Sequence, residues 1–214
     1  MEQGREKMLL ADIGNTTFHI FDGRSVAHLS YDDAIAKYKD QALYYVSVKH
    51  QLEEKIAKIG QWKNISHMLL LKGAYETMGV DRKALCLSHQ NGVFVDAGSA
   101  ITVDSVRNGI YQGGFILPGI KAYLKSFAEI SPALSSDLNA SVDLTELPLT
   151  TKDGISYGII ASIKALIEKH HTGQTLYFTG GDGALLSRFF KGAVFDETLV
   201  FKGMQKAIKE DKIC

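Results

Sequence analysis

A hairpin pattern that bears an aspartate occurs twice in this chain of 214 residues. The first copy is LLADIGNTTFHIF at residues 9–21. The second copy is the first part of the stretch VFVDAGSAITVDSVRNGIYQGGFILPGI at residues 93–120. Each copy has an apolar run, an aspartate, a glycine, small polar residues and a second apolar run, which predicts strand, tight turn and strand. Because a recurring unit marks a repeated architecture, the chain is expected to form two like domains that face one cleft.

The turn of each hairpin suits a phosphate group and a cation. Gly98 has no Cβ, so a ligand can approach the backbone closely, and Ser99 adds a hydroxyl. Successive N–H groups of such a turn can form an anion-binding concavity. The carboxylate of Asp12 can hold Mg²⁺ directly or through water. A turn that only closes the hairpin is the structural alternative.

Composition narrows the range of partners. Hydrophobic residues make up 45% of the chain and charged residues 22%, which is ordinary for a globular protein with a sizeable core. Lys and Arg total 24, as do Asp and Glu, so no overall field draws the protein to nucleic acid or to an anionic membrane. We expect neither partner, and any anionic ligand must be held by local geometry.

We expect a cytoplasmic protein. The apolar run before Asp12 is too short for a signal peptide, and no window approaches the roughly 18 apolar residues of a membrane span. Cys86 and Cys214 match no metal or redox spacing, and we interpret both as reduced thiols.

The first half is predicted to have the element order β-β-β-α-β-α-β. Its predicted strands are residues 8–13, 17–22, 26–31, 43–48 and 66–71, and its predicted helices are residues 32–39 and 51–59. A glycine-bearing loop and a short helix follow, up to residue 90. The order then restarts, with strands at 93–96, 101–106, 110–117 and 174–179, and helices at 119–130, 153–170, 184–190 and 198–210. Residues 131–150 are expected to be an irregular surface excursion.

This duplicated unit resembles the actin-like, or ribonuclease H-like, phosphotransferase fold. Within that superfamily the chain is similar to type III pantothenate kinases over essentially its whole length. The segments that carry the resemblance are DIGNTTFH at 12–19, GVDR at 79–82, DAGSAITVD at 96–104, GGFILPGI at 113–120 and TTKDGISYG at 150–158. GVDR placed just before the second hairpin, with GGFILPG after it, is specific to this family.

The resemblance implies an α/β fold of two similar actin-like domains, residues 1–89 and 90–214, each with a mixed five-stranded sheet, flanking helices and a cleft between them. It also implies an enzyme, a phosphotransferase with an alcohol acceptor. The reaction is ATP-dependent phosphorylation of pantothenate to 4′-phosphopantothenate, the first step of coenzyme A biosynthesis. ATP with Mg²⁺, a monovalent cation (K⁺ or NH₄⁺) and a homodimer whose partner subunit completes the substrate pocket are implied as well.

The resemblance places ATP on the first hairpin and on part of the second. The residues expected to contact ATP are Asp12, Ile13, Gly14, Asn15, Thr16, Thr17, Phe18, His19 and Ser99. Ser99 stands where most members have Thr, so the hydroxyl is retained and a methyl is lost. Asp96 matches the position that binds the monovalent cation. The turn from Gly180 to Gly183 resembles the adenosine-side turn of the fold.

Asp81 and Arg82 are the candidates for the acceptor site. A primary alcohol needs a group that accepts its proton as the O–P bond forms, and a carboxylate can do this. By resemblance Asp81 is that catalytic base, and Gly79, Val80, Asp81 and Arg82 line the pantothenate site. The planar fork of Arg82 can clamp an anionic substrate. An ion pair between neighbours at a helix N-terminus is the structural alternative.

Two further expected substrate contacts depart from the family pattern. Tyr75 stands closer to Gly79 than the corresponding tyrosine of most members, which indicates a shorter loop. Thr151 aligns with a threonine that usually follows Asn, but here it follows Thr150, so the choice between the two threonines stays open. Asp104 is interpreted in one of two ways. It is either an acid that contacts the residues of the site and not the ligand, or a solvated carboxylate at a strand end.

Two other functions stay open from the sequence. The first is another actin-fold small-molecule kinase, or a phosphohydrolase. In a phosphohydrolase the nucleophile is water, which would not need Arg82. The second is a nonenzymatic transcriptional accessory factor. The neutral charge and the presence of Asp12, Asp81 and Asp96 count against that second alternative.

Overall fold

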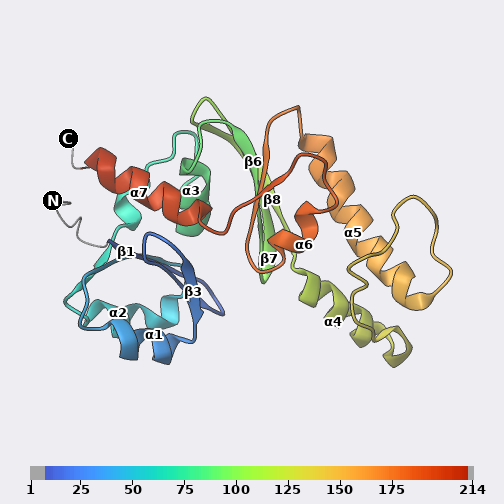
Figure 1. The fold of residues 1–214 in the computed structure, drawn as a ribbon, viewed down its shortest axis with the longest axis horizontal. Helices are drawn as coiled ribbons and strands as arrows, with labels where there is room; N and C mark the ends of the chain where they lie inside the picture. Colours follow the sequence, from blue (N-terminus) through green and yellow to red (C-terminus); the bar gives the residue numbers. More distant parts are fainter. Residues whose placement is uncertain (1–7, 212–214) are drawn as a thin grey trace. The chain divides into compact units, whose positions relative to one another are not determined.

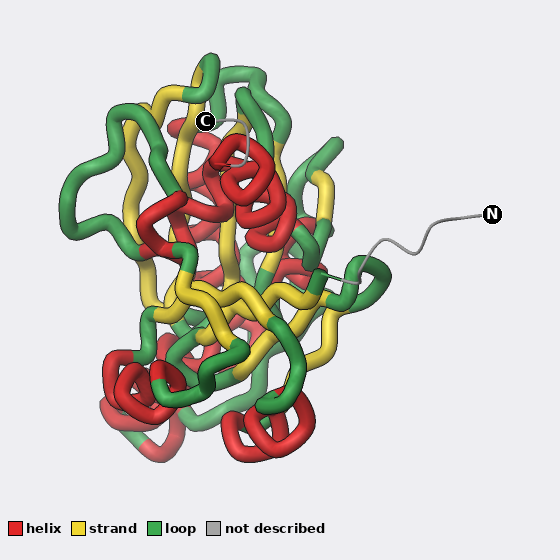
Figure 2. The backbone as a smooth tube through the Cα atoms, turned by 90° about the vertical axis from the view of Figure 1, so that its left-hand side faces the viewer, coloured by secondary structure: helices red, strands yellow, loops and turns green. Residues whose placement is uncertain are grey.

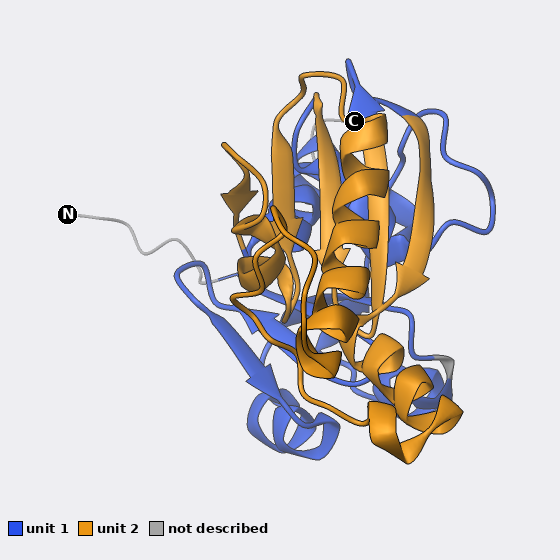
Figure 3. Cartoon of the chain, turned by 90° about the vertical axis from the view of Figure 1, so that its right-hand side faces the viewer, with its two compact units in different colours: residues 1–90, 106–111, 197–214 blue, residues 91–105, 112–196 orange. Residues whose placement is uncertain are grey.

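The computed structural model of the protein describes residues 8–211, which form two compact units (Figure 3). Unit 1 contains the described parts of residues 1–90 and 197–214 together with residues 106–111, and unit 2 contains residues 91–105 and 112–196. Each unit has a hydrophobic core of its own. Helices, strands and loops alternate along the chain in both units (Figure 2). Cys214 lies outside the described residues.

The first sheet has the strand order β3-β2-β1-β4-β5. Its strands are β1 Leu9–Ile13, β2 Phe18–Phe21, β3 Val26–Leu29, β4 Leu43–Ser47 and β5 Trp62–Asn64. The central strand β1 runs antiparallel to β2, with Asp12 opposite His19, and parallel to β4. Because the carboxyl ends of parallel strands meet at one edge of a sheet, the residues after β1 and those after β4 lie close together.

Helices cover both faces of this first sheet (Figure 1). The helical elements are α1 Tyr31–Tyr38, η1 His50–Leu52, α2 Glu53–Ala57, η2 Ser66–Met68, α3 Val80–Leu87 and α7 Leu199–Asp211. α1 and α2 bury Ala34, Tyr38 and Ile56 in a core with the fully buried Phe18. α1 begins where the N-cap Ser30 accepts a hydrogen bond from the backbone N–H of Asp33 at 3.2 Å. The opposite face is covered by α3 and α7.

The second sheet repeats the order of the first. Its strands are β6 Gly92–Ala97, β7 Ala100–Arg107, β8 Ile110–Pro118, β9 Leu176–Thr179 and β10 Val194–Phe195. They are arranged β8-β7-β6-β9-β10, with β9 parallel to both β6 and β10. The expected α/β class with two mixed five-stranded sheets is therefore confirmed.

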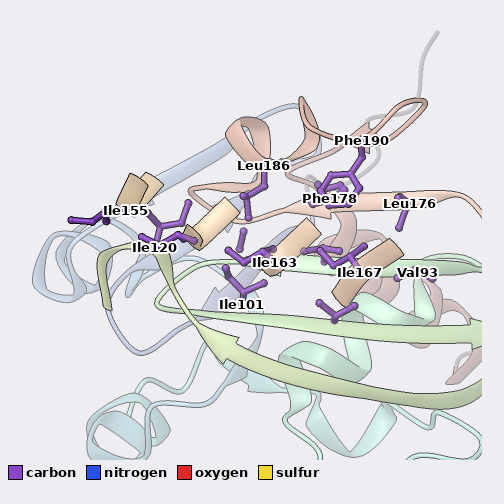
Figure 4. Packing of buried hydrophobic residues seen from close by; sticks show 14 residues of the cluster. Val93, Ile101, Ile120, Ile155, Ile163, Ile167, Leu176, Phe178, Leu186 and Phe190 are labelled. Atoms are coloured by element: carbon purple, nitrogen blue, oxygen red, sulfur yellow. The ribbon is translucent and has the colours of Figure 1, made fainter. Parts of the chain in front are cut away.

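Unit 2 is built around the long helix α5. Its helical elements are α4 Ile120–Ile130, η3 Pro132–Leu134, α5 Thr151–His170 and α6 Gly183–Ser187. α5 buries a stripe of four isoleucines against the sheet residues Val93, Ile101 and Phe178 (Figure 4). The stripe is Ile155, Ile159, Ile163 and Ile167. Leu166, the residue before Ile167, lies outside the stripe and is 38% exposed.

One predicted strand is wrong. Residues 66–71 were expected to form the fifth strand, but β5 is Trp62–Asn64 and Ser66–Met68 is a turn of 3₁₀ helix. Trp62 fixes the position of β5. The centroid of its ring lies 5.6 Å from that of Phe18, and its Nε1–H donates to the carbonyl of Tyr38 at 3.1 Å. Leu70 is 82% exposed and so does not belong to a buried strand.

No helix among residues 8–211 is long and apolar enough to cross a membrane.

The packing of α7 on α3 depends on Gly203. A Cβ at this position would overlap the backbone carbonyl oxygen of Ala84 and lie 2.7 Å from its carbonyl carbon. Backbone cannot swing aside as the end of a side chain can. The contact also fixes α3, which carries Asp81 and Arg82 in its first turn.

Gly203→Ala should therefore destabilise the protein by about 1–3 kcal/mol, the usual cost of overpacking a well-packed core. The measurement is urea unfolding followed by circular dichroism. Gly60→Ala is the matched control, since a Cβ at Gly60 meets nothing within 4 Å. Equal stability of the two variants would contradict this account of the helix packing.

Candidate functional site

The first hairpin presents an exposed tip next to Asp12. The turn between β1 and β2 is closed by the backbone N–H of Gly14, which donates to the carbonyl of Thr17 at 3.1 Å. Asn15 and Thr16 are exposed, while Asp12 is half-buried. The hydroxyl of Tyr31 donates to the carbonyl of Gly14 at 2.9 Å. A helix residue thus fixes the entry of the turn and leaves its tip accessible.

Lys49 brings a positive charge to this tip. Its Nζ donates to the carbonyl of Asn15 at 3.0 Å and lies 5.6 Å from the ring centroid of Tyr31. An ammonium group at an exposed turn favours an anionic ligand. The sequence reasoning missed Lys49, although a signal existed. Lys49 follows β4, whose carboxyl end lies at the same edge as that of β1.

The members of the segment 12–19 are not equally available to a ligand. The side chains of Ile13 and Phe18 are fully buried, so these two residues can meet a nucleotide only through their backbone. Thr17 is half-buried. The polar side chains at the tip are therefore the ones that can donate to phosphate oxygens.

His19 contributes no charge at neutral pH. Its Nδ1 lies 2.7 Å from Nδ1 of His28, so one of the two nitrogens accepts and must be unprotonated. Burial first, and the nearby charge of His28 second, lower the pKa of His19 from 6.5 to about 4. His28 itself faces a carboxylate, with Nε2 3.9 Å from Oε2 of Glu197.

The carboxylate of Asp81 lies against Gly79 at the start of α3. Asp81 Oδ1 accepts from the backbone N–H of Arg82 at 2.7 Å. A Cβ on Gly79, the N-cap residue, would lie 2.5 Å from the same oxygen. Any other residue at position 79 would force the Asp81 carboxylate to move from this position. The first turn of the helix thus holds the half-buried carboxylate of Asp81 beside the buried guanidinium of Arg82.

Arg82 is held by two tyrosines. Its side chain is buried, with 6% of the residue exposed. Nη1 donates to the hydroxyl of Tyr75 at 2.7 Å, and Nη2 donates to the hydroxyl of Tyr111 at 3.4 Å. The guanidinium also lies 5.9 Å from the ring centroid of Tyr75. Tyr75 is thus placed beside Arg82 despite the shorter loop, and Tyr111 is a residue that sequence reasoning missed.

In unit 2, Asp96 lies against Gly180. Gly180 has φ +83°, and a Cβ there would overlap Asp96 Oδ1 and lie 2.6 Å from the carbonyl oxygen of Ala97. The backbone N–H of Asp182 donates to the same carbonyl at 2.9 Å. The Gly-rich turn 180–183 is therefore fixed to the end of β6. Burial raises the pKa of the Asp182 carboxyl, and the charge of Lys121 opposes this rise.

The second hairpin also meets the start of α4. Gly98 N–H donates to the carbonyl of Ala100 at 3.0 Å, and Gly119 N–H donates to the carbonyl of Ser99 at 3.2 Å. A Cβ on Gly119 would overlap the carbonyl oxygen of Gly98 and lie 2.6 Å from that of Ser99. Ser99 is exposed. The N-terminus of the 11-residue helix α4 is therefore packed directly against the backbone of the second hairpin.

Thr150 and Thr151 differ in hydrogen bonding and exposure. Thr150 is the N-cap of α5, where its Oγ1 accepts from the N–H of Asp153 at 3.1 Å and donates to Asp153 Oδ2 at 2.8 Å. Thr151 is exposed in the first turn. Asp153 is further fixed by Asn139, whose Nδ2 donates to Oδ1 at 2.7 Å. These hydrogen bonds, that from Asn139 foremost, lower the pKa of the Asp153 carboxyl.

The two interpretations of Asp104 are also separated. Asp104 lies on β7 and is 0% exposed, so the solvated strand-end carboxylate is wrong. A buried carboxylate needs hydrogen-bonding or charged partners.

The candidate residues discussed above form three groups, two in unit 1 and one in unit 2. Unit 1 brings Tyr75, Asp81 and Arg82 together and separately forms the hairpin of Asp12, while unit 2 places Asp96 and Ser99 at the end of β6. No group of three or more His, Cys, Asp or Glu side chains that could hold a metal ion occurs among residues 8–211. A magnesium ion bound through one or two carboxylates and substrate phosphates needs no such group.

Comparison with known proteins gives one family. The model of the type III pantothenate kinase family matches residues 62–172. A protein of Campylobacter jejuni (strain RM1221), named type III pantothenate kinase, is 41% identical over 204 residues, which cover 95% of this chain and 98% of that protein.

Two solved structures are also similar. One from Campylobacter jejuni, described as a conserved protein of the Baf family of transcriptional activators, is 40% identical with a TM-score of 0.88, covering 97% of this chain and 100% of the other. Another from Sinorhizobium meliloti, described as a 2-dehydro-3-deoxygalactonokinase, has a TM-score of 0.60 at 12% identity and covers 95% and 96% of the two chains. That likeness shows the shared fold alone.

The histidine pair generates a prediction about pH. In the folded state His19 has a pKa of about 4 against an ordinary value of 6.5, so the unfolded state binds more protons between these values. Stability should be fully present above about pH 6.5 and should fall as the pH drops toward 4. His19→Gln should flatten this dependence, as measured by melting temperature across the range. NMR titration should show the pKa of His19 rising in His28→Gln, and an unchanged value would contradict the stated influence of His28.

Proposed function

The chain belongs to the type III pantothenate kinase family, and we propose the residues and ligands with which it carries out ATP-dependent phosphorylation of pantothenate. This reaction is the first step of coenzyme A biosynthesis. The observation that carries the proposal is the first turn of α3, where the carboxylate of Asp81 folds onto Gly79 next to the buried guanidinium of Arg82. An alcohol and a carboxylate are the two functional groups of pantothenate that such a pair can serve.

Asp81 is the catalytic base in this proposal. It takes the proton of the primary hydroxyl of pantothenate while the new O–P bond forms and the bond between the terminal phosphoryl group and ADP breaks. Arg82 binds the carboxylate of pantothenate as a fork of N–H donors. Gly79, Val80, Tyr75 and Thr151 complete the pantothenate contacts. Orientation and charge supply most of the rate, so no covalent intermediate is needed.

ATP is bound by the hairpin residues from Asp12 to His19 and by Ser99. The exposed Asn15 and Thr16 donate to phosphate oxygens, Lys49 adds a positive charge, and Ile13 and Phe18 contribute backbone only. Asp12 holds the Mg²⁺ that accompanies ATP, which neutralises phosphate charge when bound. In the second hairpin, the exposed hydroxyl of Ser99 is a further donor to phosphate.

Asp96 is the proposed ligand of a monovalent cation, K⁺ or NH₄⁺. Its carboxylate is held against Gly180, beside the carbonyl oxygen of Ala97. Carboxylate and carbonyl oxygens are suitable ligands for a hard cation. We also propose that the protein acts in the cytoplasm as a homodimer whose partner subunit completes the substrate pocket, without nucleic acid or membrane partners.

A transcriptional accessory role is the second candidate function, because the similar Campylobacter jejuni structure is described as a transcriptional activator. This role would not need a proton acceptor at position 81. An Asp81→Asn protein that kept full activity in the cell would therefore favour it over the kinase.

The kinase proposal predicts the behaviour of Asp81→Asn. Loss of a general base should lower kcat for pantothenate phosphorylation by about 10²–10⁴-fold, because an amide cannot accept the proton. The measurement is initial-rate ADP formation with saturating pantothenate. Asp40→Asn, which changes an exposed aspartate of unit 1, is the control and should keep the wild-type rate. A rate for Asp81→Asn equal to that of the control would refute the assigned base.

The cation assignment gives a separate prediction. The wild-type rate should be higher with K⁺ than with Na⁺ as the only monovalent salt, and Asp96→Asn should abolish the difference. Gly180→Ala should do the same, since its Cβ would displace the Asp96 carboxylate. Asp137→Asn, an exposed aspartate of unit 2, is the matched control. Full K⁺ stimulation in Asp96→Asn would rule out Asp96 as the cation ligand.

A further inference from the structure

The environment of Arg82 is unusual for a substrate-binding arginine. A buried guanidinium is costly unless its N–H groups have acceptors. Two of those acceptors are neutral phenol oxygens, those of Tyr75 and Tyr111, and each is bonded to a different terminal nitrogen. A phenol oxygen accepts a hydrogen bond from the guanidinium and itself carries no charge.

The two tyrosines differ in how firmly they are held. Tyr111 is 8% exposed, whereas Tyr75 is 46% exposed. Tyr111 lies on β8, and its backbone N–H donates to the carbonyl of Lys72 at 2.8 Å. Gly73, with φ +84°, packs on it so closely that a Cβ would lie 2.9 Å from the carbonyl oxygen of Tyr111. Tyr111 is therefore the fixed partner of Arg82 and Tyr75 the accessible one.

The two aromatic rings lie side by side, with centroids 6.2 Å apart and an angle of 54° between their planes. The loop that carries Tyr75 is thus anchored to β8 both by backbone contact and by ring contact. A phenol that accepts from Arg82 still has its own O–H to donate. The accessible Tyr75 can direct that proton to a bound carboxylate, while Tyr111 keeps the guanidinium in place.

We propose that Tyr111 is a positioning residue that aims the guanidinium of Arg82 at the carboxylate of the acceptor substrate, and so sets the preference for an anionic over a neutral acceptor. The inference rests on the proposed function. It adds a residue outside the motifs at 79–82 and 96–104, and it assigns that residue to specificity and not to phosphoryl transfer.

Tyr111→Phe tests the proposal, because it removes the hydroxyl and keeps the ring. The substrates are pantothenate and its analogue with an alcohol in place of the carboxylate. The variant should raise KM for pantothenate about tenfold, as for loss of a hydrogen bond to a charged group. Its kcat, its KM for ATP and its KM for the neutral analogue should stay at wild-type values. Tyr44→Phe, at a half-buried tyrosine of β4, is the matched control.

Arg82→Lys provides a second readout. In that background, Tyr111→Phe should have no further effect on KM for pantothenate, since the fork it aims is gone. If Tyr111→Phe does not fold, Tyr111→Met takes its place, because it also removes the hydroxyl and should likewise raise KM for pantothenate without raising KM for the neutral analogue.

Three outcomes would overturn the inference. They are an unchanged KM for pantothenate in folded Tyr111→Phe, an unchanged KM for pantothenate in folded Tyr111→Met where that variant takes its place, and an equal rise of KM for the neutral analogue. Each presupposes that the wild-type protein phosphorylates pantothenate. A wild-type protein inactive on pantothenate would instead refute the proposed function, and this inference with it.

Discussion

Close contact between glycine and an acid or a carbonyl is the constraint on which the candidate site depends. Asp81 occupies space that a side chain at position 79 would need, and Asp96 stands in the same relation to Gly180. At the second hairpin, Gly119 lets the start of α4 approach the backbone of Gly98. A Cβ at Gly79 or Gly180 would move a carboxylate, and one at Gly119 would push the start of α4 away from the hairpin. The carboxylate positions are therefore set by local packing and by short turns.

The electrostatic design is local, as expected for a chain with no net charge. Burial keeps His19 neutral, so the positive charge near the first hairpin comes from Lys49. In the first turn of α3, the guanidinium of Arg82 is hydrogen-bonded to two neutral phenols, and the carboxylate of Asp81 accepts from a backbone N–H. Unit 1 thus carries two separate positive groups, Lys49 at the first hairpin and Arg82 in the first turn of α3.

Much of the fold could be predicted from local pattern. The Asp-Gly hairpins, the isoleucine stripe of α5 and its start near Asp153 follow from spacing and capping that the sequence displays directly. The strand β5 could not be predicted in the same way, because its position is decided by how Trp62 packs against Phe18 across the sheet. A tertiary contact overrode the local apolar run at 66–71.

The same distinction applies to the site. Motifs placed Asp81 and Arg82 in the first turn of one helix, since neighbours in sequence stay neighbours in space. Tyr111 is 29 residues from Arg82 and belongs to no motif, so only the three-dimensional structure reveals their hydrogen bond. The close approach of Gly180 to Asp96 likewise joins segments far apart in the chain.

The central claim is that an alcohol of pantothenate, and not water, receives the phosphoryl group. The most direct measurement follows ADP release with and without pantothenate and identifies the products by mass spectrometry. The account predicts equal amounts of ADP and phosphorylated pantothenate, with little ADP when pantothenate is omitted. ADP and inorganic phosphate formed at the same rate in its absence would contradict the account and indicate a phosphohydrolase.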